Sequence, residues 1–139
     1  VELALAIGAD GVHVGQEDME AGKVREKLGP DKIIGVSAHS VEEAVKAEKS
    51  GADYLGAGAV FSTSTKGDAG ALSMETLKAI CSSVSIPVVA IGGIKEKNIL
   101  SLKGTGVAGA AIVSGIFARK NIREACVRLR SLAKEMVEE

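Results

Sequence analysis

The sequence predicts an α/β fold: a parallel barrel of the TIM (β/α)8 class, of which this chain carries about five β/α units. Short runs rich in Val and Ile alternate with amphipathic stretches along the whole chain. Glycines follow several of these runs, as expected where a barrel shares one site among many loops. A dinucleotide-binding sheet would need GxGxxG after its first strand, which is not present. We expect a single domain over residues 1–139.

The predicted elements alternate regularly. The expected strands are Gly11–Gly15, Lys32–Ser37, Asp53–Gly58, Pro87–Gly92 and Ala108–Ser114. The expected helices are Ala21–Leu28, Val41–Ser50, Met74–Ser83, Lys95–Lys103 and Ile122–Val137, with a short helical turn over Ile116–Ala118. Ser40 is expected to cap the second helix, with Glu43 returning the hydrogen bond as in a capping box.

Five strands are too few for a barrel of eight, which takes about 200–250 residues. We therefore expect the amino-terminal strands to be missing from this chain, since its first residues look like the end of a helix that enters a strand. Unpaired strand edges favour association with another chain. We expect the polypeptide to self-associate as a homo-oligomer, or to be complemented by the missing strands.

Composition excludes several classes of partner. The net charge is −1 and Lys and Arg are spread along the chain, so nucleic acid is not an expected partner. No apolar stretch approaches the roughly 18 residues of a membrane span. Cys81 and Cys126 lie in predicted helices without CxxC spacing, which indicates buried free thiols in a reducing compartment. The expected location is the cytoplasm.

Polar side chains follow the first two predicted strands. One of the two carboxylates of Glu17 and Asp18 could bind Mg²⁺ through oxygen, or both could simply favour the start of the next helix. Ser37 could donate to an anion or act only as a cap, and His39 could do acid–base chemistry or be a surface histidine. His13 lies within a strand between Val12 and Val14, which predicts a hydrogen-bonded core histidine.

The later strand ends suit phosphate groups. Four hydroxyl residues and Lys66 follow the third strand in a loop of about a dozen residues, where hydroxyl donors beside an ammonium group suit a diphosphate. Gly93 follows the fourth strand, and Val113 and Ser114 end the fifth, where backbone amides could bind a phosphate. The alternatives are a loop without a ligand and glycines that serve only tight turns.

In order and spacing, the motifs GADGVHVGQEDM, GVSAHS, GADYLGAGAVFSTSTKGDA, IPVVAIGGI and AAIVSGIF resemble the thiamine-phosphate synthase family along almost the whole chain. The resemblance implies a Mg²⁺-dependent transferase that joins hydroxymethylpyrimidine diphosphate to hydroxyethylthiazole phosphate. It implies Asp18 as a Mg²⁺ ligand, with Ser37 and Lys66 as catalytic residues. The implied contacts to the pyrimidine diphosphate are Ser37, Thr63, Thr65 and Lys66, and those to the thiazole phosphate are Gly93, Val113 and Ser114.

The chain departs from the family pattern in two places. The family's upstream Gln/Arg/Lys strand end and Asn-Asp pair are not in this sequence, which argues against full activity of the polypeptide alone, and Gly67 stands where many relatives have a second lysine. One alternative is the related thiazole tautomerase, in which a histidine at about the position of His39 moves protons. Another is a non-catalytic half-barrel that only binds a phosphorylated ligand.

Overall fold

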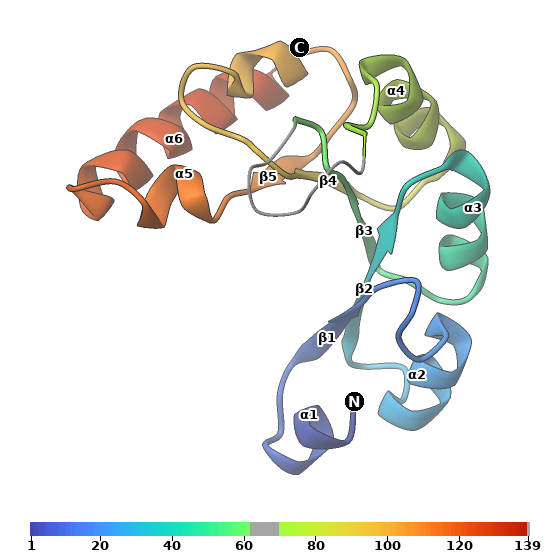
Figure 1. The fold of residues 1–139 in the computed structure, drawn as a ribbon. Helices are drawn as coiled ribbons and strands as arrows, with labels where there is room; N and C mark the ends of the chain where they lie inside the picture. The colour runs from blue at the N-terminus through green and yellow to red at the C-terminus, as the bar shows by residue number, and fades with distance from the viewer. Residues whose placement is uncertain (62–69, 139) are drawn as a thin grey trace.

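The computed structural model describes residues 1–61 and 70–138 (Figure 1). Helices and strands alternate, as the sequence predicts. The elements are α1 (Glu2–Ala6), β1 (Gly11–Val14), α2 (Ala21–Leu28), β2 (Ile33–Ala38), α3 (Val41–Lys49), β3 (Tyr54–Gly58), α4 (Met74–Ser83), β4 (Val88–Ile91), the 3₁₀ helix η1 (Ile99–Leu102), β5 (Gly109–Ala111), α5 (Ser114–Phe117) and α6 (Ile122–Val137). Among these described residues, no helix combines the length and the apolar character that crossing a membrane requires.

The five strands form one parallel sheet in the order β1-β2-β3-β4-β5. Each strand pairs with the next one in the chain; Val12 is opposite Ile34, for example, and Leu55 is opposite Val88. Figure 1 shows a curved sheet with α2, α3 and α4 on its convex side, whereas its concave side is open. The α/β class with a parallel sheet is thereby confirmed. This consecutive strand order is the one found in β/α barrels.

The hydrophobic core lies between the sheet and its helices. Leu55 of β3 is fully buried, as are Leu77 and Ile80 of α4 and Ile99 and Leu102 of η1. Apart from Met136, the buried apolar residues are Val, Ile, Leu and Ala. Each large aliphatic side chain contributes about 1.5–3 kcal/mol when it is fully buried. The predicted aliphatic core is therefore confirmed.

The start of α3 is stabilised by two hydrogen bonds. Ser40 Oγ accepts from the Glu43 backbone N–H at 3.2 Å, as predicted. The Glu43 carboxylate accepts from the backbone N–H of His39 at 2.7 Å, one residue before the expected partner. Both bonds satisfy donors that precede the first intrahelical hydrogen bonds. The reciprocal cap therefore exists, but it is shifted by one residue.

Two predictions about local structure are wrong. The helix expected over residues 95–103 is only the short η1, because the Asn98 side chain competes with a helical backbone: its Oδ1 accepts from the Lys95 N–H at 2.8 Å and its Nδ2 donates to the Gly93 carbonyl at 2.9 Å. The expected burial of both thiols also fails. Cys81 is half-buried, but Cys126 is exposed, since α6 buries a different face through Ala125 and Leu129.

Candidate functional site

The carboxyl ends of the parallel strands meet along one edge of the sheet, and most of the predicted site residues lie there. They are Asp18 after β1, Ser37 in β2, Gly93 after β4, and Val113 and Ser114 after β5. Three further predicted residues, Thr63, Thr65 and Lys66, lie outside the described residues. The described candidate residues therefore come from β2 and from the segments that follow β1, β4 and β5.

The loop after β1 is held in place by its own polar side chains. Asp18 Oδ2 accepts from the backbone N–H of Gly15 at 2.7 Å. Gln16 Nε2 donates to the carbonyl oxygen of Ser37 at 2.6 Å, which joins this loop to β2. Asp18 also lines a cavity of about 240 Å³, together with Glu20 and other residues. The loop thus holds an exposed carboxylate beside the end of β2.

The described residues suit a magnesium ion shared between the protein and a substrate phosphate better than one held by protein ligands alone. Across residues 1–61 and 70–138, no three His, Cys, Asp or Glu side chains are grouped to hold a metal. Mg²⁺ is often held by one or two carboxylates together with the phosphate oxygens of a substrate. A single exposed carboxylate from Asp18 suits that second arrangement.

Ser37 belongs to a hydrogen-bonded cluster that spans three strands. His13 Nε2 lies 2.9 Å from Ser37 Oγ, and His13 Nδ1 lies 2.9 Å from the hydroxyl of Tyr54. His13 is hydrogen-bonded, as predicted, but the prediction that it lies in the core is wrong. His13 lies on the open face of the sheet and is exposed, whereas Val14 points to the helices and is buried.

The His13 ring is shielded from water on one side. This desolvation lowers the pKa of His13, and the carboxylate of Asp18 partly opposes the effect by raising it. Although the residue as a whole is exposed, its ring packs against the sheet at Gly56. The physical consequence is that the neutral ring is favoured.

Two residues of this region were not predicted, Tyr54 and Gln16. For Tyr54, the available signal was the pair of glycines at 35 and 56, inside β2 and β3, because a glycine within a strand often marks a close approach by another group. A Cβ added at Gly35 would overlap the Tyr54 ring and His13 Nδ1, and one at Gly56 would lie 3.1 Å from His13 Cε1. The two glycines make room for the cluster.

His39 lies apart from this cluster. Its side chain is exposed, and its Nδ1 lies 3.1 Å from Glu43 Oε2, at the first turn of α3. The histidine is thus engaged in the helix cap. Of the two interpretations of His39, the contacts favour the surface histidine.

The loops after β3, β4 and β5 contact one another. Gly93 has φ +67°, a conformation that favours glycine, and a Cβ there would lie 2.9 Å from Phe61 Cβ. A Cβ at Gly115 would lie 2.5 Å from the carbonyl oxygen of Ile94. The segments around Gly93 and Ser114 are therefore adjacent. Val113 and Ser114 are both exposed.

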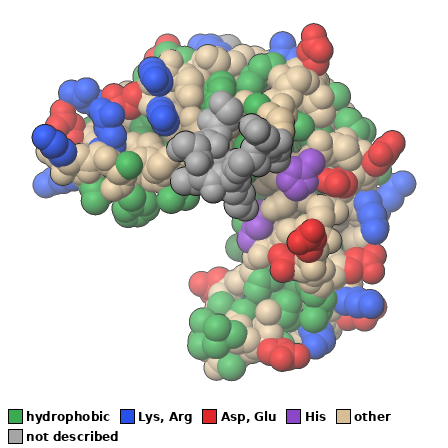
Figure 2. Space-filling view, viewed as in Figure 1, with side chains coloured by type: hydrophobic (Ala, Val, Ile, Leu, Met, Phe, Trp, Pro, Cys, Tyr) green, Lys and Arg blue, Asp and Glu red, His purple; other side chains and the backbone are tan. Residues whose placement is uncertain are grey.

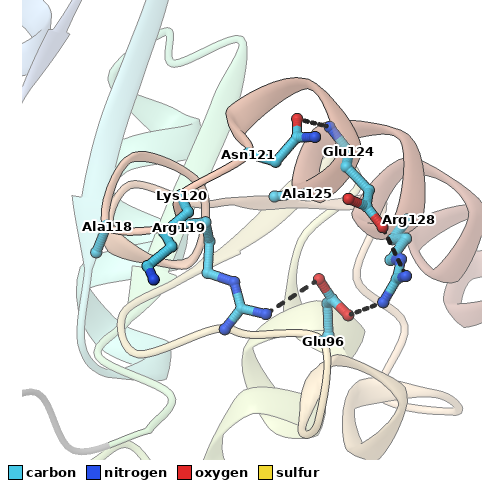
Figure 3. Close-up of a pocket in the computed structure, with 8 residues that line it drawn as sticks. All are labelled: Glu96, Ala118, Arg119, Lys120, Asn121, Glu124, Ala125 and Arg128. Atoms are coloured by element: carbon cyan, nitrogen blue, oxygen red, sulfur yellow. Dashed lines mark hydrogen bonds and ion pairs between the residues drawn. The ribbon is translucent and has the colours of Figure 1, made fainter.

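A second cavity, of about 400 Å³, lies beside the start of α6 (Figure 3). Two of its three basic side chains are paired: Glu96 lies 3.9 Å from Arg119 and 3.7 Å from Arg128, and Arg128 also contacts Glu124 at 2.7 Å. Figure 3 shows Glu96 pointing between the two guanidinium groups. Because a carboxylate at this point would repel a phosphate, we interpret the cavity as a surface ion-pair network.

Comparison with known proteins identifies the family of the chain. A sequence model of the family described as thiamine monophosphate synthase matches residues 1–116. The chain is 57% identical over 129 residues to the thiamine-phosphate synthase of Ruminiclostridium cellulolyticum, covering 93% of this chain and 61% of that protein. It is 59% identical over 124 residues to the protein of the same name from Clostridium acetobutylicum, covering 89% and 59%.

A solved structure described as thiamine phosphate pyrophosphorylase from Pyrococcus furiosus resembles the fold with a TM-score of 0.88 and 46% identity. The similarity covers 99% of this chain and 65% of that one. The chain thus spans about three fifths of the length of the curated relatives it matches, 61% and 59% for the two above. The family model covers most of the chain. We conclude that the chain belongs to the thiamine monophosphate synthase family.

Proposed function

We propose that this chain carries out, or forms part of, the thiamine-phosphate synthase reaction. The observation that carries the proposal is its 57% and 59% identity to two proteins of that name. In the proposed reaction, the thiazole nitrogen forms a bond to the methylene carbon of hydroxymethylpyrimidine diphosphate. The bond from that carbon to the diphosphate oxygen breaks, and pyrophosphate leaves with the electron pair. The products are thiamine phosphate and pyrophosphate.

Ser37 and Lys66 are the proposed catalytic residues at the diphosphate, with Thr63 and Thr65 as further contacts. Negative charge gathers on the pyrophosphate as it leaves, and an ammonium group with nearby hydroxyls stabilises such charge. Of these four residues, only Ser37 belongs to the part of the chain that the structure describes. It is half-buried and lies near the carboxyl end of β2. We propose a dissociative path in which positioning and fixed charge supply the rate, without a covalent enzyme intermediate.

Gly93, Val113 and Ser114 are the proposed binding residues for the thiazole phosphate. Support comes from the contact between the loops after β4 and β5, which brings these segments together. A glycine lets a phosphate approach the backbone closely. The residues proposed for this phosphate and Ser37 lie along the same edge of the sheet, as a reaction between two bound substrates requires.

Asp18 is the proposed protein ligand for Mg²⁺. When bound, the ion would neutralise charge on the diphosphate and so assist its departure. Asp18 is exposed and its Oδ2 accepts a hydrogen bond from Gly15, which fixes the direction of the carboxylate. The residue is therefore oriented before any ion arrives.

We propose that residues 1–139 form a single domain and that the five-stranded sheet is an arc of a TIM barrel. The consecutive parallel order of its strands supports this. Large apolar side chains are exposed, among them Leu3, Ile7, Val113 and Phe117. Among the described residues, β1 and β5 each pair on one side only, and such open edges are expected to favour self-association or the binding of further strands. Sedimentation as a monomer at all concentrations would contradict this expectation.

The proposed location is the cytoplasm, where free thiols such as Cys81 and Cys126 persist. Fractionation of the source cells tests this location. Recovery with the soluble cytoplasmic enzymes is expected, and recovery outside the cytoplasm would contradict it.

The function is tested by mixing the chain with both substrates and Mg²⁺ and following thiamine phosphate. Activity should disappear with EDTA and fall strongly in Lys66→Ala. The exposed Lys97, which lies outside the proposed site, gives a matched control, Lys97→Ala. Proton exchange on the thiazole ring without Mg²⁺ would instead indicate the tautomerase. Binding of substrates without turnover would indicate a non-catalytic half-barrel.

A further inference from the structure

The cluster of His13, Ser37 and Tyr54 joins three neighbouring strands on the open face of the sheet. His13 is its centre, since each ring nitrogen lies 2.9 Å from one of the two hydroxyls. The rings of His13 and Tyr54 are tilted by 41°, with centroids 5.4 Å apart. Figure 2 shows histidine side chains near the inner curve of the molecule, where its surface is hollowed. A hydrogen-bonded chain therefore runs from Tyr54 through His13 to Ser37.

The backbone around the cluster leaves little freedom to these rings. Gly35 is opposite His13 on one side and Tyr54 on the other in the strand register. A Cβ at Gly35 would overlap both rings, so they lie directly against the backbone of β2. Contact with the sheet on one side and two hydrogen bonds at the ring nitrogens together restrict the orientation of His13.

The chemistry of the three groups decides the direction of the hydrogen bonds. A neutral imidazole has one donor and one acceptor nitrogen, and desolvation, which lowers the pKa of His13, favours that neutral form. A phenol is more acidic than an aliphatic hydroxyl, so it is the stronger hydrogen-bond donor and the weaker acceptor. Tyr54 therefore donates to Nδ1, and the Nε2–H of His13 donates to Ser37 Oγ. The Ser37 proton is left to point outward.

We propose that His13 and Tyr54 are positioning residues that hold the Ser37 hydroxyl as a hydrogen-bond donor toward the pyrimidine diphosphate. The ligand named here rests on the proposed function, whereas the direction of the hydrogen bonds does not. Tyr54 acts at a distance, since its hydroxyl contacts His13 and fixes which ring nitrogen carries the proton. A second-layer partner of this kind is a common way to orient a functional group.

The kinetic test is a double-mutant cycle of Tyr54→Phe and Ser37→Ala. Phenylalanine keeps the ring against Gly35 and removes only the hydroxyl. Loss of one such hydrogen bond is expected to lower kcat/KM for the pyrimidine diphosphate by about tenfold, with KM for the thiazole phosphate unchanged. In the Ser37→Ala background, the same substitution should change nothing. Equal losses in both backgrounds, or no loss in either, would overturn the proposal.

The exposed Ser101, which lies outside the proposed site, provides the control. Ser101→Ala should keep full activity. Its midpoint of thermal unfolding should match those of the Tyr54→Phe and Ser37→Ala variants. His13→Gln extends the cycle, because glutamine retains one donor and one acceptor group. It should retain more activity than His13→Phe. Equal losses in these two variants would count against a hydrogen-bonding role for His13.

A second readout does not require activity. Nitrogen-15 NMR of the imidazole rings reports which nitrogen carries the proton, and His39→Gln identifies the signals of His13. The Nε2–H form is expected, and Tyr54→Phe should shift the ring toward a mixture of the two forms. A chain with the Nε2–H ring that is inactive both alone and when fused to the upstream β/α units of a relative would overturn the proposed function but not the arrangement. An active chain with the Nδ1–H ring would overturn the arrangement alone.

Discussion

The guanidinium group of Arg25 contacts the carboxylate of Asp53 at 2.6 Å, and this ion pair joins α2 to the entry of β3. Arg25 also donates to the carbonyl oxygens of Gly29, Lys32 and Gly51. Asp53 Oδ2 accepts in addition from the backbone N–H of Ile34 at 2.7 Å. These bonds hold neighbouring β/α units together at the amino-terminal ends of the strands, away from the candidate site.

Arg25→Met should destabilise the fold without changing the site. Methionine retains the apolar stem but leaves several half-buried carbonyls without their donor, which is expected to cost about 2–3 kcal/mol. The measurement is the free energy of unfolding in urea. Lys27→Met is the matched control, since Lys27 and Glu2 form an exposed surface pair at 3.2 Å. Its effect should stay below about 1 kcal/mol, and equal losses in the two variants would contradict this role of Arg25.

The Asp53 carboxylate should make stability depend on acid pH. Burial acts to raise the pKa of Asp53, but the Ile34 N–H and Arg25 outweigh it and hold the pKa below the usual value. The unfolded chain therefore binds more protons, and the stabilisation present above about pH 4 is lost as the pH falls through the folded-state pKa. Asp53→Asn should show a shallower loss of unfolding free energy below pH 4 than the unaltered chain. Parallel curves would argue against the pairing.

Gly35→Ala should disturb His13 and Tyr54 together. The added methyl group overlaps both rings, and overpacking of this kind costs about 1–3 kcal/mol. We expect lower stability, a loss of synthase activity and altered NMR signals of His13. Gly109→Ala in β5 is the control, because a Cβ there meets nothing within 4 Å. If both variants behave like the unaltered chain, the close packing at Gly35 is wrong.

Removal of the Glu96 charge should have little effect on the reaction. Its ion pairs with Arg119 and Arg128 are long and lie at the surface, so Glu96→Gln is expected to change stability by less than about 1 kcal/mol. The kinetic constants for both substrates should be unchanged. A large rise in KM for the thiazole phosphate would instead assign the cavity of Figure 3 to the substrate site.

Local signals predicted most of the fold. The bounds of α2, α4 and α6 agree with the expected ones to the residue, because each helix has a clear apolar face and Ser73 and Asn121 cap the last two. The short η1 was not predicted, since its limit is set by the Asn98 side chain. Sequence alone shows that Asn98 can form such bonds, but not that it does.

The placement of the candidate residues at strand ends could be predicted from the sequence, but their contacts could not. Polar residues at strand ends, such as Asp18 and Ser37, follow directly from the motif pattern. The roles of His13 and Tyr54 depend on strand register, because only the pairing of β1, β2 and β3 brings them beside Ser37. The glycines at 35 and 56 were visible in the sequence, yet their meaning required knowing what lies across the strand.

The proposed synthase function is tested by measuring both products at once. The chain, alone and fused to the upstream β/α units of a curated relative, is mixed with hydroxymethylpyrimidine diphosphate, thiazole phosphate and Mg²⁺. Thiamine phosphate and pyrophosphate are expected in equal amounts from at least the fused protein, with a strong loss in Lys66→Ala. If neither form yields product while the relative itself is active in the same assay, the proposed synthase function is contradicted.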